Sequence, residues 1–145
     1  MMKLAIVLIG AILSAVMYRM GGSGRFPRQV RVIGVPLVNC LTLGLLGGWN
    51  WLLLLCMGLS CAAISTYWGK KDDDKTFINY WLHGLGIALA FLPYAWATGH
   101  WIGFSGRLLI LPLAVGFWSV KTSWDVLEES GRGFWIGLTI PLLLI

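Results

Sequence analysis

Four arginines and three glycines lie in the segment 18–31, between the first two apolar stretches of the chain. A guanidinium group can grip a phosphate with two parallel hydrogen bonds, and glycines let backbone N–H groups turn toward an anion. The segment therefore predicts an anion-binding site for a lipid headgroup or a phosphorylated substrate. Its candidate residues are Arg25, Arg28, Arg31, Gly22 and Gly24.

A simpler interpretation of the same segment stays open. Arginines in a cytoplasmic connection fix the topology of a membrane protein and rest against anionic headgroups, at about 1 kcal/mol each. The segment is not a Walker loop, because no Lys-Ser/Thr follows the glycines at the required spacing.

The second candidate cluster is acidic and lies in the segment 121–133. On a helix, Asp125, Glu128 and Glu129 would occupy positions i, i+3 and i+4 of one face. Three neighbouring carboxylates repel each other unless a cation neutralises them. Three alternatives remain: a site for a hard metal such as Mg²⁺, pairing with the arginines of segment 18–31, or a solvated interfacial helix.

Two polar residues, His83 and Asn79, fall inside an apolar stretch. An ionisable side chain within a membrane is costly and often functional, although a lone histidine usually hydrogen-bonds to a neighbouring helix. Gly84 and Gly86 follow His83 and would let such a helix approach closely. The charged run 70–75 is expected to be a solvent-exposed turn.

The composition indicates an integral membrane protein. Of the 145 residues, 58% are apolar and only 12% are charged, whereas a soluble domain needs about a quarter charged. The length allows one domain, 1–145. The three cysteines lie in apolar runs and are expected to be small buried side chains rather than disulfide or zinc ligands. Nucleic acid is not an expected partner, because no basic face carries exposed aromatic residues.

Helices of near twenty residues are needed to cross a bilayer. The expected fold is an all-α polytopic transmembrane helix bundle, with six spans favoured and five as the alternative, because the second and sixth candidates are short. The candidate spans are 2–20, 32–46, 49–68, 77–97, 101–120 and 134–145.

Charge placement predicts the orientation of these spans. With six spans, nine of the eleven basic residues and all six acids fall in the first, third and fifth connections. The positive-inside rule then places these three connections in the cytoplasm and both termini on the other side.

Three runs, 18–22, 31–37 and 118–133, resemble small multi-pass membrane proteins carried by tailed bacteriophages and prophages. The resemblance implies a bacterial inner membrane as the location. It brings no catalytic residues with it, so whether the chain is an enzyme stays open.

The leading functional hypothesis is a membrane protein whose cytoplasmic face binds an anionic group, with lipid modification as a second step beyond binding. One alternative is an oligomeric pore or ion transporter, in which the pairs Gly44/Gly48 and Gly133/Gly137 bring helices of a homo-oligomer together. Another is a phage lysis or superinfection-exclusion factor, which would fit the phage resemblance.

Overall fold

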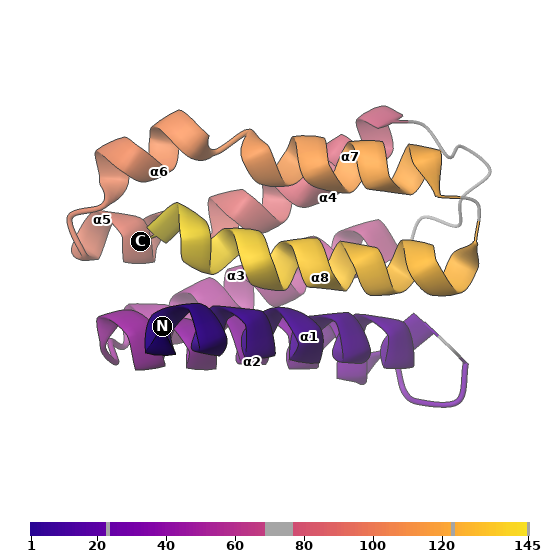
Figure 1. Cartoon of the computed structure of the whole chain (residues 1–145), viewed down its shortest axis with the longest axis horizontal. Helices are drawn as coiled ribbons and strands as arrows, with labels where there is room; N and C mark the ends of the chain where they lie inside the picture. The colour runs from indigo at the N-terminus through magenta and orange to yellow at the C-terminus, as the bar shows by residue number, and fades with distance from the viewer. Residues whose placement is uncertain (23, 69–76, 123, 145) are drawn as a thin grey trace.

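The chain folds as an all-α bundle, as expected (Figure 1). The computed structural model describes residues 1–22, 24–68, 77–122 and 124–144, apart from the side chains of Tyr67, Trp68 and Asp125. Within these ranges there are eight helices and no strand. The helices are α1 (Met2–Gly22), α2 (Gln29–Gly47), α3 (Leu52–Trp68), α4 (Phe77–Ala90), α5 (Leu92–Ala97), α6 (Trp101–Arg107), α7 (Ile110–Lys121) and α8 (Asp125–Leu144).

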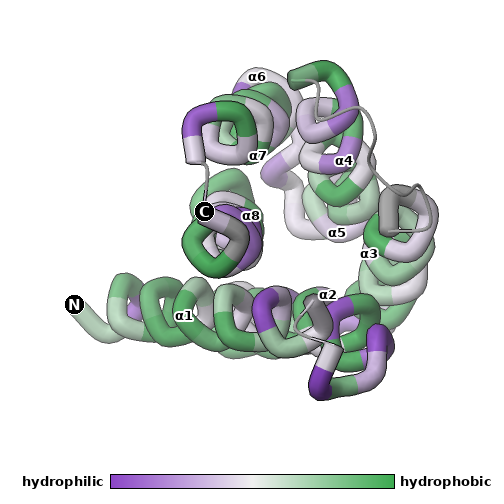
Figure 2. Tube along the Cα trace, turned by 90° about the vertical axis from the view of Figure 1, so that its right-hand side faces the viewer, coloured by the Kyte–Doolittle hydropathy of each residue, from purple (hydrophilic) through white to green (hydrophobic). Residues whose placement is uncertain are grey.

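Helix α8 lies in the middle of the bundle, with α1 and α2 on one side and α7 and α4 on the other (Figure 2). Both chain termini and the α2–α3 connection lie at one end of the bundle. The α1–α2 connection, the end of α7 and the start of α8 lie at the opposite end (Figure 1). We call this opposite end the charged end, because Arg19, Arg31, Glu128 and Glu129 all belong to it.

Prolines divide two of the expected spans. The stretch 77–97 is interrupted at Phe91, just before Pro93 in the first turn of α5. The stretch 101–120 is interrupted between α6 and α7, at Leu108 and Leu109. Pro112 has no N–H to donate to the Leu108 carbonyl, and its ring crowds that carbonyl, which explains the second break.

The last helix is longer than the sequence indicated. The expected sixth span began at residue 134, whereas α8 begins at Asp125 and has 20 residues. Its first turns therefore contain most of the segment that was expected to be a connection. Glu128 and Arg132 form an i,i+4 ion pair there, and such a pair supports helix while it neutralises both charges.

Among the residues that the structure describes, three helical stretches are long and apolar enough to cross a membrane: Met2–Gly22, Gln29–Gly47 and Trp101–Lys121. Large apolar side chains such as Leu8, Ile12 and Leu45 face outward, while the interior holds polar side chains such as Ser14 and Asn39. A soluble protein rarely exposes such wide apolar surfaces. Helices solvated by lipid are expected to have this distribution.

Two glycines of α8 allow it to pack directly on α1. A Cβ atom at Gly133 would lie 2.5 Å from the carbonyl oxygen of Ser14, and one at Gly137 would lie 2.8 Å from the Cα atom of Ala11. This pair was expected to join helices of different copies in the pore hypothesis. In the structure it serves the packing of a single chain, as small residues do between membrane helices.

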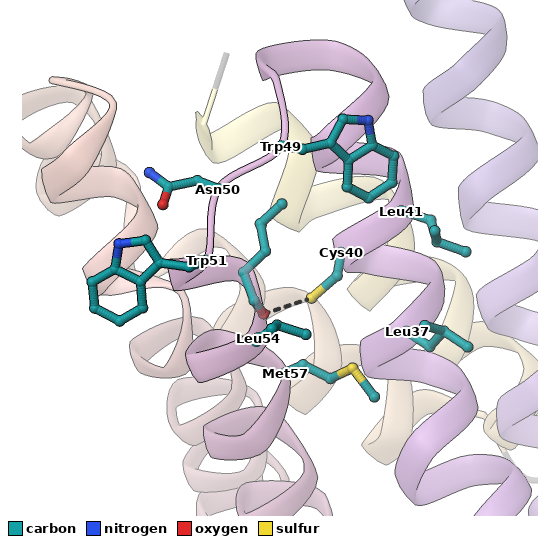
Figure 3. A pocket seen from close by; sticks show the side chains of 9 residues that line it. Leu37, Cys40, Leu41, Trp49, Asn50, Trp51, Leu54 and Met57 are labelled. Carbon is teal, nitrogen blue, oxygen red and sulfur yellow. Dashed lines mark hydrogen bonds between the residues drawn. The ribbon is translucent and has the colours of Figure 1, made fainter.

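At the end opposite the charged end, α2 and α3 border a groove of about 400 Å³ (Figure 3). Trp49 and Trp51 lie at its rim and are largely exposed, as expected for indoles near a membrane boundary. Cys40 lines the groove and its Sγ donates to the Leu53 carbonyl at 3.2 Å. All three cysteines are free thiols; Cys40 and Cys56 are buried, as expected, whereas Cys61 is partly exposed.

A candidate anion site at the charged end

Glu129 of α8 lies between two arginines that come from different helices. Its Oε1 atom is 3.1 Å from Nη2 of Arg31 on α2, and its Oε2 atom is 3.3 Å from Nη1 of Arg19 on α1. Of the three alternatives for the acidic cluster, pairing with the arginines of segment 18–31 is therefore confirmed for Glu129. The ion pairs connect three helices at one point.

Arg31 is the buried member of this group, with only 2% of its side chain exposed. Its Nε atom donates to the Tyr18 carbonyl at 2.9 Å, and its guanidinium group lies 4.1 Å from the centroid of the Tyr18 ring. This carbonyl lies near the C-terminal end of α1, so the arginine side chain connects the start of α2 to the end of α1. A buried charge of this kind is stable only when it is paired and hydrogen-bonded.

The side chain of Glu128 points to a different side of α8 from that of Glu129. It is buried, pairs with Arg132 and accepts a hydrogen bond from the Tyr80 hydroxyl at 3.2 Å. Arg132 also donates to the Ser119 hydroxyl at 2.8 Å, and its guanidinium group lies 4.2 Å from the centroid of the Tyr80 ring. This second ion-pair group connects α8 to α4 and α7.

The expectation that the acidic residues share one face is therefore wrong for Glu128 and Glu129. Consecutive residues of a helix point about 100° apart, so these two carboxylates reach different neighbours of the central helix. The side chain of Asp125 lies outside the described residues. In the described part of the chain, no group of three His, Cys, Asp or Glu side chains is arranged to hold a metal ion.

The structure separates the three arginines that were expected to bind an anion together. Arg31 points into the protein, whereas Arg25 and Arg28 are exposed in the α1–α2 connection. Gly24 lies between them and α1 with a positive φ of 74°, a conformation that glycine adopts without strain. Arg25 and Arg28 therefore form the outward-facing part of the candidate site.

Gly22 has a structural role that the sequence did not indicate. A Cβ atom there would collide with Nη2 of Arg31 and with both carboxylate oxygens of Glu129. The glycine therefore lets the end of α1 lie directly against this ion pair. Such a close approach explains why a residue without a side chain is needed at this position.

His83 forms the interhelical hydrogen bond that was expected of it. Its Nε2 atom lies 3.1 Å from the Tyr18 hydroxyl, which joins α4 to α1 next to the two ion-pair groups. Gly84 permits the predicted close approach, because a Cβ atom there would lie 2.9 Å from the Cα atom of Pro112 on α7. Asn79 is exposed on the first turn of α4.

Several residues of the charged end were missed by the sequence interpretation. The pairing of Arg132 could have been predicted, since it follows Glu128 by four residues, the spacing of a helical ion pair. No sequence pattern predicted the roles of Tyr18, Tyr80 and Ser119, because these roles depend on contacts between helices. The charged run 70–75 lies outside the described residues.

Comparisons of the chain with family models, with curated protein sequences and with solved structures gave no match.

Proposed function

We propose that this chain is a membrane protein whose charged end binds a phosphate-bearing anion through Arg25 and Arg28. One observation carries the proposal. Glu128 and Glu129 are turned toward interior arginines, while Arg25, Arg28 and Lys121 remain exposed at the same end of the bundle. The outward-facing surface of this end is consequently basic among the residues that the structure describes.

The start of α2 adds a second favourable feature. Arg28 is the N-cap of this 19-residue helix, and no side chain caps its first N–H groups by a hydrogen bond. The N–H groups of Val30 and Arg31 donate to the carbonyls of Pro27 and Arg28, so the favourable feature is the positive end of the helix dipole, which attracts an anion. Phosphate groups commonly bind where such a helix start meets arginine side chains.

The proposed location is a bacterial inner membrane, which the resemblance to phage membrane proteins supports. We propose six crossings: α1, α2, α3, α4 with α5, α6 with α7, and α8. The charged end would then face the cytoplasm, where anionic phospholipids accumulate and attract arginines. The bound phosphate would come from a phospholipid headgroup or from a phosphorylated solute, and both sources use the same chemistry.

Replacing Arg25 and Arg28 together with alanine is expected to weaken binding of phosphatidylglycerol about 30-fold, from about 1 kcal/mol for each arginine. The measurement is lipid titration of the detergent-purified protein followed by native mass spectrometry, with phosphatidylcholine as the zwitterionic comparison. The matched control is Lys3→Ala with Arg107→Ala, which removes two exposed positive charges elsewhere on the chain.

The same titration distinguishes the two sources of phosphate. Competition by millimolar inorganic phosphate or glycerol 3-phosphate would identify a soluble ligand, and its absence would identify the lipid headgroup. Equal binding of phosphatidylglycerol, inorganic phosphate and glycerol 3-phosphate by the wild type and the double variant would refute the proposal.

The proposed orientation predicts a labelling pattern. Cysteines at Phe26 and Thr122 should react with a membrane-impermeant maleimide only from the cytoplasmic side, and a cysteine at His100 only from the other side. These positions leave every arginine in place, so the variants keep the charges that set the topology. The background is Cys61→Ala, because Cys61 is the most exposed native thiol. Labelling of Phe26→Cys and Thr122→Cys from opposite sides would exclude a shared site.

A further inference from the structure

Glu129 is held by its two arginines in unequal ways. Arg31 is buried and has further contacts with the carbonyl and the ring of Tyr18, so its position is fixed. Arg19 is 35% exposed, and its contact in the described part of the chain is with Glu129. A partly exposed ion pair contributes less free energy than a fully buried one, so Arg19 can exchange its partner at lower cost than Arg31 can.

Arg19 is also close in the chain to the proposed anion site. It lies in the last turn of α1, directly before the connection that carries Arg25 and Arg28. Gly22 covers the Arg31–Glu129 pair without a side chain, and the Glu129 carboxylate is itself 20% exposed. Arg19 can therefore turn toward the connection without leaving a cavity in the core.

We infer, on the basis of the proposed function, that Arg19 is a third arginine of the anion site and that Glu129 is its intramolecular competitor. A bound phosphate takes Arg19 from the Glu129 carboxylate, because it offers more acceptor oxygens for charge-assisted hydrogen bonds. Glu129 keeps its bond to the buried Arg31 throughout. The carboxylate thus occupies Arg19 when no anion is bound, and it limits the affinity of the site.

The test uses phosphatidylglycerol titration of the detergent-purified full chain. Arg19→Ala is expected to weaken binding about 5-fold, and Glu129→Gln is expected to tighten it by a similar factor. The combined variant should bind no more tightly than Arg19→Ala alone, because Glu129 acts through Arg19. Glu128→Gln is the matched control, since the neighbouring carboxylate faces Arg132 and should leave binding unchanged.

Thermal unfolding separates competition from a purely structural role. Arg19→Ala should unfold close to the wild-type temperature, because the residue is partly exposed, so it tests the inference even if Glu129→Gln folds poorly. Unchanged binding in Arg19→Ala would overturn the inference. Weaker phosphatidylglycerol binding by a folded Glu129→Gln variant would also overturn the inference.

These outcomes are distinct from a failure of the proposed function. If Arg25 and Arg28 control binding while Arg19→Ala binds as the wild type does, the inference alone is wrong. If the Arg25/Arg28 double variant also binds normally, both proposals fail.

Discussion

Replacing Arg31 with alanine is expected to lower the free energy of unfolding by about 3–5 kcal/mol, the usual cost of breaking a buried ion pair. The substitution leaves Glu129 with the weaker, partly exposed Arg19 as its partner. It also removes the hydrogen bond from Arg31 to the Tyr18 carbonyl and the cation that stacks on the Tyr18 ring. The measurement is reversible unfolding in mixed detergent and dodecyl sulfate micelles, followed by circular dichroism.

The matched control for this prediction is Arg28→Ala, which removes the same side chain from an exposed position three residues earlier. Its effect should stay within about 0.5 kcal/mol, as is usual for surface substitutions. A double variant, Arg31→Met with Glu129→Leu, should recover part of the loss, because no buried charge is then left unpaired and the partly exposed Arg19 can be solvated. Equal stabilities of Arg31→Ala and Arg28→Ala would show that Arg31 is not buried in the folded protein.

The different positions of Arg31 and Arg28 were partly readable from the sequence. Arg31, Val35 and Asn39 are spaced by four residues, and all three are buried on one face of α2. A charged residue in line with an inward face is a candidate for a buried ion pair. Arg28 lies outside this line. The sequence interpretation instead grouped Arg28 and Arg31 because they are three residues apart.

The gathering of charge at one end was predictable because it depends on helix length and connection order alone. The division of these charges into two separate ion-pair groups was not predictable. Glu128 and Glu129 differ only in direction around α8, and the direction matters because this helix lies between two other layers (Figure 2). No local pattern in the sequence shows that α8 is central. The role of Gly22 could not be predicted from a local pattern either, since it depends on the position of the Arg31 side chain in the folded chain.

The breaks near Pro93 and Pro112 show a similar limit. Proline predicts a disturbance of a helix, but Pro36 and Pro141 lie inside α2 and α8, which continue through them. The same residue type therefore ends one helix and is tolerated in another. Neighbouring helices and local adjustments decide which outcome occurs in a membrane bundle.

Replacing Gly133 with alanine is expected to destabilise the protein by about 3 kcal/mol, at the upper end of the usual cost of overpacking. The added methyl group would meet the carbonyl oxygen of Ser14 at 2.5 Å and the Cα atom of Ala15 at 2.8 Å. Both atoms belong to the backbone of α1, so no side-chain rotation can relieve the contact. The helix itself would have to move away from α8.

The control is Gly58→Ala, in an exposed position of α3 where an added Cβ atom meets nothing within 4 Å. Alanine favours helix over glycine by up to about 1 kcal/mol, so this variant should be slightly more stable than the wild type. If Gly133→Ala lowers the free energy of unfolding and Gly58→Ala raises it, the loss at Gly133 is caused by the packing of α8 on α1. The same micelle unfolding measurement applies, and a neutral Gly133→Ala variant would contradict the close helix contact.

Gly137→Ala provides a further check, because its added Cβ atom would meet α1 one helical turn away, 2.8 Å from the Cα atom of Ala11. Both substitutions push α1 in the same direction, so one displacement of the helix relieves both contacts. The double variant should therefore lose less stability than the two single losses added together. That displacement would also move Tyr18 away from Arg31 and His83, so the charged end should lose anion affinity in parallel with stability.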